Sequence, residues 1–373
     1  MRTPSNDKIV EAAVALAEAW QNRANELLTA EEKGIAQQAY LPDSYDMQKE
    51  LTAWAGKRVA SGGSPIRIRI VKGANMEMEQ LEAAIHNGLT SGLESLDRRE
   101  QEYWRERINA GNLYINRGTT GAMVLRQPFG GMGKSALGAG IKAGGPNYVS
   151  QFMDFEEVDL PFVGAIQDDH ALLRLAAEWK QKLNWGQLGE FKIDLLKTIR
   201  AVKSYLYHWE QEFSQEKDYF HLRGQDNIVR YLPVGTVVVR IHPDDSLFDV
   251  LARVAAVKIS GCNLLISLTR GLNNKVTEFL KNNPGKRFID DTAVTEQSDK
   301  DLVAIIPGIQ RIRYAAPGRV PEDVFRAAAR TGLYISRTPV LMEGRIEVLQ
   351  YLREQSICNN YHRYGNLGER ALI

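Results

Sequence analysis

The sequence has 373 residues, of which 44% are hydrophobic and 25% are charged, a composition that is ordinary for a globular protein of two or three domains. Lysine and arginine number 47 against 46 acidic residues, so this balance gives no reason to expect nucleic acid or an anionic membrane as a partner. Two cysteines are too few for a disulfide framework, and no apolar run approaches the roughly 20 residues that span a bilayer.

The N-terminal half reads as a mixture of helix and strand. Apolar residues at helical spacing predict an amphipathic helix over residues 6–33, which carries acidic residues and does not resemble a signal peptide. We therefore expect a cytoplasmic protein. A short apolar run at 38–41, a helical segment at 46–59 and an alternating run at 66–71 then predict one strand–helix–strand unit within residues 34–82.

A charged helix is expected at residues 96–110, before a glycine-rich loop that spans 112–146. Two further helices are expected within residues 168–222. From residue 226 onward, strands and helices alternate, and this alternation predicts a doubly wound α/β domain. We expect its strands at 231–239, 263–268, 302–306, 309–314 and 332–336, and its helices at 247–260, 274–282, 322–330 and 344–355.

The glycine-rich loop admits three interpretations. Gly133-Lys134-Ser135 could end a phosphate-binding P-loop, but Pro128 stands where the first glycine of that motif belongs and lacks the N–H that would bind phosphate. Residues 138–143 fit a loose dinucleotide-binding fingerprint, but no convincing strand precedes them and Gly144-Gly145-Pro146 prevents the helix that should follow.

The third interpretation is a resemblance, because residues 112–146 resemble the C-terminal end of an aldehyde dehydrogenase. The match is to the glutamate-semialdehyde dehydrogenase half of the bifunctional proline utilisation A family. It implies that the loop Thr120-Gly121-Ala122 holds a substrate carboxylate through backbone N–H groups, and that Phe129 packs beside the aldehyde site. The alternative is that this loop now only packs.

Residues 34–82 resemble the proline dehydrogenase half of the same family. Gln38 in QAYL, and Arg69 and Lys72 in RIVKGAN, match flavin-side strands of its (β/α)₈ barrel, and the position of Arg69 approaches the flavin there. One strand–helix–strand unit cannot close an eight-stranded barrel. The family uses FAD and NAD, but we expect this chain alone to bind neither cofactor.

Residues 226–373 resemble the cofactor-binding half of an aldehyde dehydrogenase, with three departures. Pro243-Asp244-Asp245 replaces a turn whose asparagine stabilises an oxyanion, Ser267-Leu268-Thr269 replaces a lysine-bearing segment that contacts the cofactor, and Ala315-Ala316-Pro317 replaces the turn that faces the pyrophosphate. The resemblance therefore implies the non-catalytic aldehyde-dehydrogenase-like domain of long family members.

No catalytic or metal-binding residue emerges from the remaining candidates. Cys262 and Cys358 lack the sequence context of the family's nucleophile and are expected to be buried or incidental thiols. The six histidines have no metal-ligand spacing.

We expect the following division of the chain. It comprises a helical arm at 1–33, a barrel fragment at 34–82, an aldehyde dehydrogenase C-terminal segment at 83–160, a helical connector at 161–225 and the non-catalytic α/β domain, folding independently, at 226–373.

These expectations imply a relative of the proline-catabolism enzyme that lacks activity alone. The alternative is a non-catalytic assembly or scaffold module. We expect a homo-oligomer or a complex with an intact family member, because the region around 111–148 should leave apolar side chains such as Tyr114, Ile115 and Val124 incompletely covered.

Overall fold

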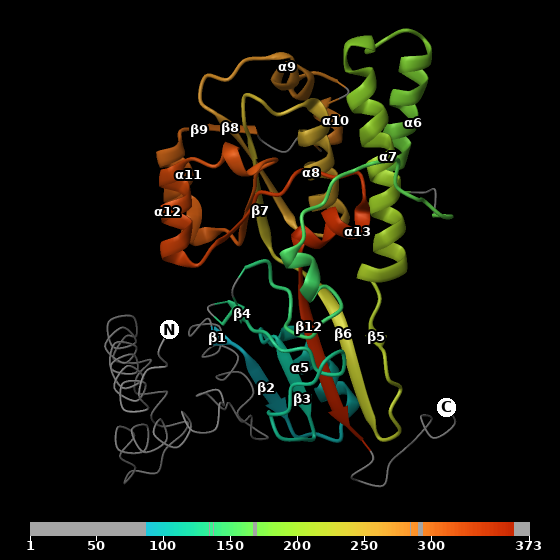
Figure 1. Cartoon of the computed structure of the whole chain (residues 1–373), viewed down its shortest axis with the longest axis vertical. Coiled ribbons are helices and arrows are strands. Elements are labelled where there is room, and N and C mark those ends of the chain that lie inside the picture. Colours follow the sequence, from blue (N-terminus) through green and yellow to red (C-terminus); the bar gives the residue numbers. More distant parts are fainter. Residues whose placement is uncertain are drawn as a thin grey trace.

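The computed structural model describes residues 87–133, 135–136, 138–166, 170–283, 285–289 and 294–361. The predicted helical arm and barrel fragment, with Gln38, Arg69 and Lys72, lie outside these residues. Within them, the chain forms an α/β fold with two five-stranded sheets and a small two-stranded one (Figure 1). No helix of the described part is long and apolar enough to cross a membrane.

The first large sheet is entirely parallel and has the strand order β11-β10-β7-β8-β9. Its strands are β7 (Thr236–Ile241), β8 (Asn263–Thr269), β9 (Val294–Gln297), β10 (Arg311–Arg313) and β11 (Tyr334–Ser336). Its helices are α8 (Leu247–Ile259), α9 (Lys275–Lys281), α10 (Gly285–Phe288), α11 (Asp299–Ile305), α12 (Glu322–Thr331) and the short α13 (Gly344–Glu347).

Helices cover both faces of this parallel sheet, as the doubly wound prediction requires. Val237 and Val239 of β7 belong to the core that contains α8, whereas Val238 between them packs with Leu302 of α11 and Val324 of α12. Alternate side chains of a strand point to opposite faces, so this division follows from the pleat. All three valines are fully buried, which explains the continuous apolar run of β7.

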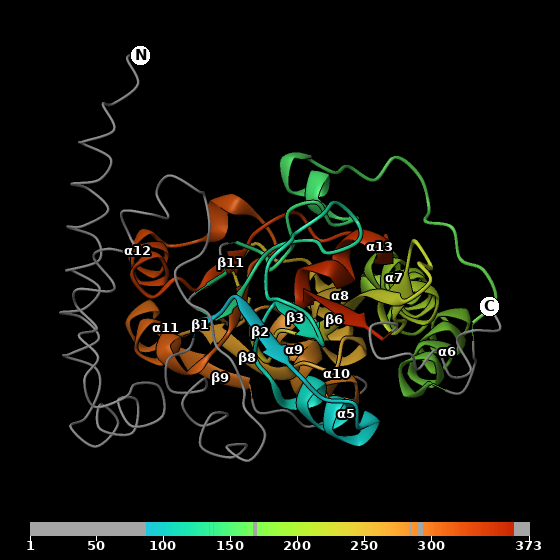
Figure 2. The same ribbon diagram turned by 90° about the horizontal axis from the view of Figure 1, so that it is seen from below.

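Two longer helices, α6 (Ala171–Asn184) and α7 (Lys192–His208), flank the parallel sheet on the side opposite α11 and α12 (Figures 1 and 2). Trp179 of α6 is fully buried against Phe279 and Phe288, with ring centroids 6.2 and 4.8 Å away. The two helices predicted within residues 168–222 are thereby confirmed, and they share the core of the parallel sheet.

The second large sheet is mixed and has the order β2-β3-β12-β6-β5. Its strands are β2 (Thr90–Leu93), β3 (Asn112–Ile115), β5 (Lys217–Asp218), β6 (Gln225–Pro233) and β12 (Leu352–Asn360), and α5 (Arg98–Arg107) connects β2 to β3. β12 pairs in parallel with β3 and antiparallel with β6. A two-stranded sheet of β1 (Asn87–Gly88) and β4 (Met132–Gly133) lies beside it.

The parallel sheet lies wholly within residues 226–373, but pairing of β12 with β3 means that the mixed sheet does not. Strand β12 adds to a sheet that includes residues 90–115, and independent folding of residues 226–373 stays a prediction. The mixed sheet thus crosses the boundaries predicted at 160 and 225. The boundaries themselves remain predictions.

Three element predictions in the C-terminal part are wrong. The run at 231–239 is two strands in different sheets, β6 and β7, because Gly235 turns the chain between them with a φ of 112°. The strand predicted at 302–306 is helix α11, which begins at a capping box formed by Ser298 and Asp301. The helix predicted at 344–355 ends with a 3₁₀ turn at Val348–Tyr351, and β12 follows at once.

Candidate functional site

The loop predicted to hold a carboxylate follows β3 directly. Asn116 follows the strand and has a left-handed φ of 56°. Its side-chain amide accepts a hydrogen bond from the Ser95 N–H and donates one to the Ser95 carbonyl, both at 2.9 Å. Thr120, Gly121 and Ala122 are exposed beyond it. Gly121 has a φ of 107°, which other residues rarely adopt, so a glycine is needed there.

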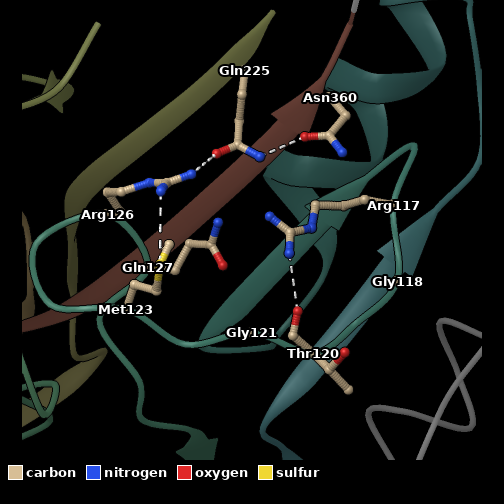
Figure 3. Close-up of a pocket in the computed structure, with 9 residues that line it drawn as sticks. All are labelled: Arg117, Gly118, Thr120, Gly121, Met123, Arg126, Gln127, Gln225 and Asn360. Atoms are coloured by element: carbon tan, nitrogen blue, oxygen red, sulfur yellow. Dashed lines mark hydrogen bonds between the residues drawn. The ribbon is translucent and has the colours of Figure 1, made fainter. Parts of the chain in front are cut away.

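A pocket of about 360 Å³ opens beside this loop (Figure 3). Its lining residues come from the loop after β3, from the turn before Pro128, and from the ends of β6 and β12. They are Arg117, Gly118, Thr120, Gly121, Met123, Arg126, Gln127, Gln225 and Asn360.

Two of the four residues predicted for this site line the pocket and two do not. Thr120 and Gly121 lie on its wall, whereas Ala122 is outside it. Phe129 exchanges two backbone hydrogen bonds of 2.9 Å with Ala143 and also lies outside the pocket. Phe129 therefore does not share a cavity with Thr120 and Gly121, and the role of this loop as a carboxylate anchor stays a prediction.

Two arginines that the sequence analysis did not single out hold the pocket together. Arg117 donates from Nη2 to the Thr120 carbonyl at 3.0 Å and so fixes the loop. The side-chain amide of Gln127 forms two hydrogen bonds in one orientation. Its oxygen accepts from Arg117 Nη1 at 2.6 Å, and its nitrogen donates to the Gly121 carbonyl. Arg126 donates to Gln225, whose amide nitrogen donates to Asn360 Oδ1 at 2.7 Å.

Neither cysteine of the chain is arranged as a nucleophile. Cys358 lies below the pocket with 1% of its surface exposed, and Arg117 Nη1 reaches its sulfur at 2.9 Å. Burial raises the pKa of the Cys358 thiol despite the opposing charge of Arg117, so the reactive thiolate is disfavoured. Cys262 is half-buried, and its thiol donates to the Tyr351 carbonyl at 3.2 Å.

A buried lysine fastens the glycine-rich loop to the mixed sheet. Lys142 donates from Nζ to the Gly130 carbonyl and, at 3.2 Å, to Asn112 Oδ1 of β3. Glu354 of β12 accepts from the Lys142 backbone N–H at 2.7 Å and from Asn147 Nδ2 at 2.6 Å. Burial lowers the pKa of Lys142 from 10.5 to about 7, although Glu354 opposes this shift.

A second candidate site lies at the carboxyl ends of the parallel strands. The strand order reverses between β7 and β10, and ligands of open α/β sheets bind in the crevice at such a point. Here the fully buried Arg253 of α8 fills it. Arg253 Nη1 donates to the Arg240 carbonyl of β7 at 2.8 Å and to the Arg313 carbonyl of β10 at 3.0 Å.

Ion pairs surround the buried Arg253, which itself pairs with the buried Asp245. The Asp245 carboxylate accepts hydrogen bonds from Arg253 and from Arg319; the bond from Arg319 is 2.6 Å long. It also accepts one from the His242 N–H at 3.0 Å. On either side, Arg240 pairs with Asp299 at 2.9 Å and Arg313 pairs with Glu347 at 2.9 Å.

The three positions that depart from the dehydrogenase pattern take part in this closure. Asp245 neutralises Arg253, and Ser267 accepts from Arg240 Nη1 at 2.8 Å. Pro317 begins the 3₁₀ turn that presents Arg319 to Asp245. Arg240, Arg253 and Arg313 were missed from the sequence, because the carboxylates that pair with them lie outside their own helix or strand.

Metal binding finds no support in this part of the molecule. Among the described residues, no group of three or more His, Cys, Asp and Glu side chains could hold a metal ion.

The pKa of Lys142 predicts a stability that rises with pH. Between about pH 7 and 10.5 the unfolded chain binds one more proton than the folded chain, so raising the pH disfavours unfolding. From pH 7 to 9 this lysine should add a slope of up to about 1.4 kcal/mol per pH unit to the free energy of unfolding. In urea unfolding of Lys142→Met, the free energy of unfolding should not show this increase with pH. Lys203→Met, at an exposed position of α7, should keep it, and equal slopes for all three proteins would contradict the prediction.

Asp245→Asn should destabilise the protein by about 3–5 kcal/mol, because it leaves the buried Arg253 without its counter-charge. Asp244→Asn is the matched control, since the Asp244 side chain is 78% exposed and should change the free energy of unfolding by about 0.5 kcal/mol or less. Denaturant midpoints of the two variants measure the difference. Similar midpoints would show that Asp245 does not stabilise the closed crevice.

Family models match the N-terminal part of the chain. A family model described as proline dehydrogenase matches residues 9–91, and a model of the aldehyde dehydrogenase family matches residues 71–158. The 1-pyrroline-5-carboxylate dehydrogenase of Geobacillus sp. (strain WCH70) is 47% identical over 75 residues, which cover 20% of this chain and 14% of that enzyme. The enzyme of the same name from Bacillus cytotoxicus is 50% identical over 66 residues, which cover 18% of this chain and 12% of the enzyme.

Among solved structures, proline utilisation A from Corynebacterium freiburgense is similar over 78% of this chain, with 30% sequence identity and a TM-score of 0.54. The similarity covers 24% of that protein, so the chain spans about a quarter of its length. The sequence matches, the α/β fold and this similarity agree: residues 9–91 are similar to proline dehydrogenase, residues 71–158 are similar to aldehyde dehydrogenases, and most of the chain is similar to part of proline utilisation A.

Proposed function

We propose that this chain is a non-catalytic relative of the enzyme that oxidises proline to glutamate through pyrroline-5-carboxylate. The observation that carries the proposal is the buried Arg253, which joins the Arg240 and Arg313 carbonyls across the crevice of the parallel sheet. A dinucleotide would have to displace a guanidinium that is hydrogen-bonded and ion-paired out of contact with water.

The two cysteine thiols support the proposal that this chain does not catalyse aldehyde oxidation. That chemistry needs a thiolate to attack the aldehyde carbon. Burial raises the pKa of Cys358, and Cys262 donates its proton to a backbone carbonyl. Neither side chain lines the pocket beside Thr120 and Gly121.

The proposal for proline oxidation rests on the sequence alone. Residues 9–91 match the proline dehydrogenase model, and Gln38, Arg69 and Lys72 within them are proposed remnants of the flavin side of the barrel. Because a closed barrel needs eight strands, we infer that this segment holds no FAD by itself.

An assembly role is the second candidate, and exposed apolar side chains favour it. The segment after the glycine-rich loop presents Val149, Phe152, Met153, Val158, Leu160 and Phe162 to solvent. Val124 of the loop is 72% exposed, as expected, whereas Tyr114 and Ile115 are buried in the sheet and that part of the expectation is wrong. Apolar surface of this kind marks protein–protein contacts.

Activity and cofactor binding test the first proposal. The purified chain should form no NADH with glutamate semialdehyde, should not reduce an electron-accepting dye with proline, and should give no saturable heat when titrated with NAD. It should also lack a flavin absorbance band after desalting. An intact family member is the positive control, and micromolar NAD binding or a retained flavin band would defeat the proposal.

Light scattering coupled to size exclusion tests the assembly role. We expect a species larger than the 41.9 kDa chain at micromolar concentration, either of this chain alone or after mixing with an intact family member. Phe152→Ser should reduce that association without lowering the free energy of unfolding, because its side chain is 75% exposed. If this chain stays a monomer both alone and after mixing with an intact family member, the assembly role is ruled out.

A further inference from the structure

A strap of residues 153–166 runs toward α6 and crosses the outer side of α7 (Figure 1). Two of its contacts are with that helix. Arg200 donates a hydrogen bond to the Pro161 carbonyl, and the Phe162 ring lies edge-on to the Tyr207 ring, with 5.7 Å between the centroids. These contacts hold the strap against α7, so its other side presents a defined surface.

The strap has an inward and an outward side. Glu157 points inward, because its carboxylate accepts a hydrogen bond from the Glu343 N–H at 3.2 Å. The outward side carries two carboxylates and then three apolar side chains: Asp154, Glu156, Val158, Leu160 and Phe162. Such alternation is typical of an extended segment. Asp159 is exposed as well, and Val158 is 93% exposed, so the outward side is an acidic and apolar surface.

Helix α7 presents a basic and apolar surface next to the strap. Residues spaced three or four apart share one side of a helix. The outer side of α7 consists of Lys192, Ile193, Leu196, Arg200, Lys203 and Tyr207. The strap contacts Arg200 and Tyr207, whereas Ile193 is 71% exposed and Leu196 is 43% exposed. Because the two lysines are exposed too, part of this side meets water.

The two surfaces match in chemistry, yet one chain cannot bring them together. The outward side of the strap points away from the helix on which the strap lies. A second copy, related by a two-fold rotation, places each strap on the α7 of the other copy, so both matches form at once. Opposite charges orient such partners, and the apolar side chains gain by leaving water.

We propose that a second copy of this chain docks here as a two-fold dimer, with the outward side of each strap on the outer side of the other α7. The proposal rests on the assembly role stated above and names its surface and its partner. The strap carboxylates then meet Lys192 and Lys203. The apolar side chains that follow them in the strap meet Ile193 and Leu196.

A membrane surface fits these residues less well than a second copy does. Anionic lipid headgroups attract lysines that lie within about a Debye length. The exposed Asp154, Glu156 and Asp159 of the strap lie on the same side of the molecule, and such headgroups would repel them. A second copy, in contrast, pairs the charges of both signs.

Charge reversal on one surface at a time tests this interface, with light scattering of the full chain as the measurement. Asp154→Lys with Glu156→Lys makes the strap basic, and Lys192→Glu with Lys203→Glu makes the α7 surface acidic. Each double variant alone should raise the apparent dissociation constant of the dimer at least about tenfold, because like charges then face each other twice in a two-fold dimer. All four positions are exposed, so the urea midpoints should stay unchanged.

An equimolar mixture of the two double variants should recover the dimer. A basic strap then meets an acidic α7 surface, and an acidic strap meets a basic one. Recovery identifies the occupant as a second copy, because only copies of this chain are present. Lys300→Glu with Arg330→Glu is the matched control, since both positions are exposed, on α11 and α12 at the far side of the parallel sheet, and it should dimerise like the unaltered chain.

Three results would each overturn this interface. The unaltered chain could be a monomer alone, either double variant with an unchanged urea midpoint could dimerise like the unaltered chain, or the mixture could stay monomeric. The first result would limit the assembly role to a complex with an intact family member. The other two would leave that role standing and place it on a different surface.

Discussion

The pairing of β12 with both β3 and β6 is the interaction on which the rest of this molecule depends. β12 lies in the middle of the mixed sheet and joins a strand from residues 112–115 to one from residues 225–233. From this one strand, Glu354 fastens the glycine-rich loop, Cys358 lies beneath Arg117, and Asn360 closes the edge of the pocket. The pairing of β12 with β3 therefore brings these three residues of β12 next to the glycine-rich loop.

The parallel sheet keeps the architecture of a ligand-binding fold while using its crevice for internal contacts. Each of the three buried arginines at the carboxyl ends is paired with a carboxylate from another element. Burying one charge without a partner is costly, so the partners stabilise the arrangement only as a set. Asp245 and Ser267 take part in these contacts directly, and Pro317 begins the turn that carries Arg319.

Local sequence patterns predict the elements of this fold whose formation does not depend on a partner distant in the chain. The α/β class and the helices α6 to α9 and α12 were predictable from periodicity. The strand β12 was not, because the apolar residues around 344–355 fit a helix and only pairing with β3 and β6 selects the extended form. Gln225 and Asn360 could not be assigned to the site without that pairing.

Charged residues inside apolar runs were the other source of error. Arg253 interrupts the helix α8, and Arg240 and Arg313 interrupt strands, yet all three are buried. A sequence pattern marks each of them as exposed, because isolated burial of an arginine is unfavourable. Their burial depends on carboxylates that lie elsewhere in the chain, which a pattern cannot supply.

The register Ser356↔Asn112 also determines when the molecule can be completed during synthesis. β3 emerges from the ribosome well before β12, its neighbour in the sheet. Until then, one side of β3 presents unpaired backbone groups, which invite pairing with another chain. Contacts of such wide sequence separation slow folding, so this sheet forms late and its first strands must wait for the last.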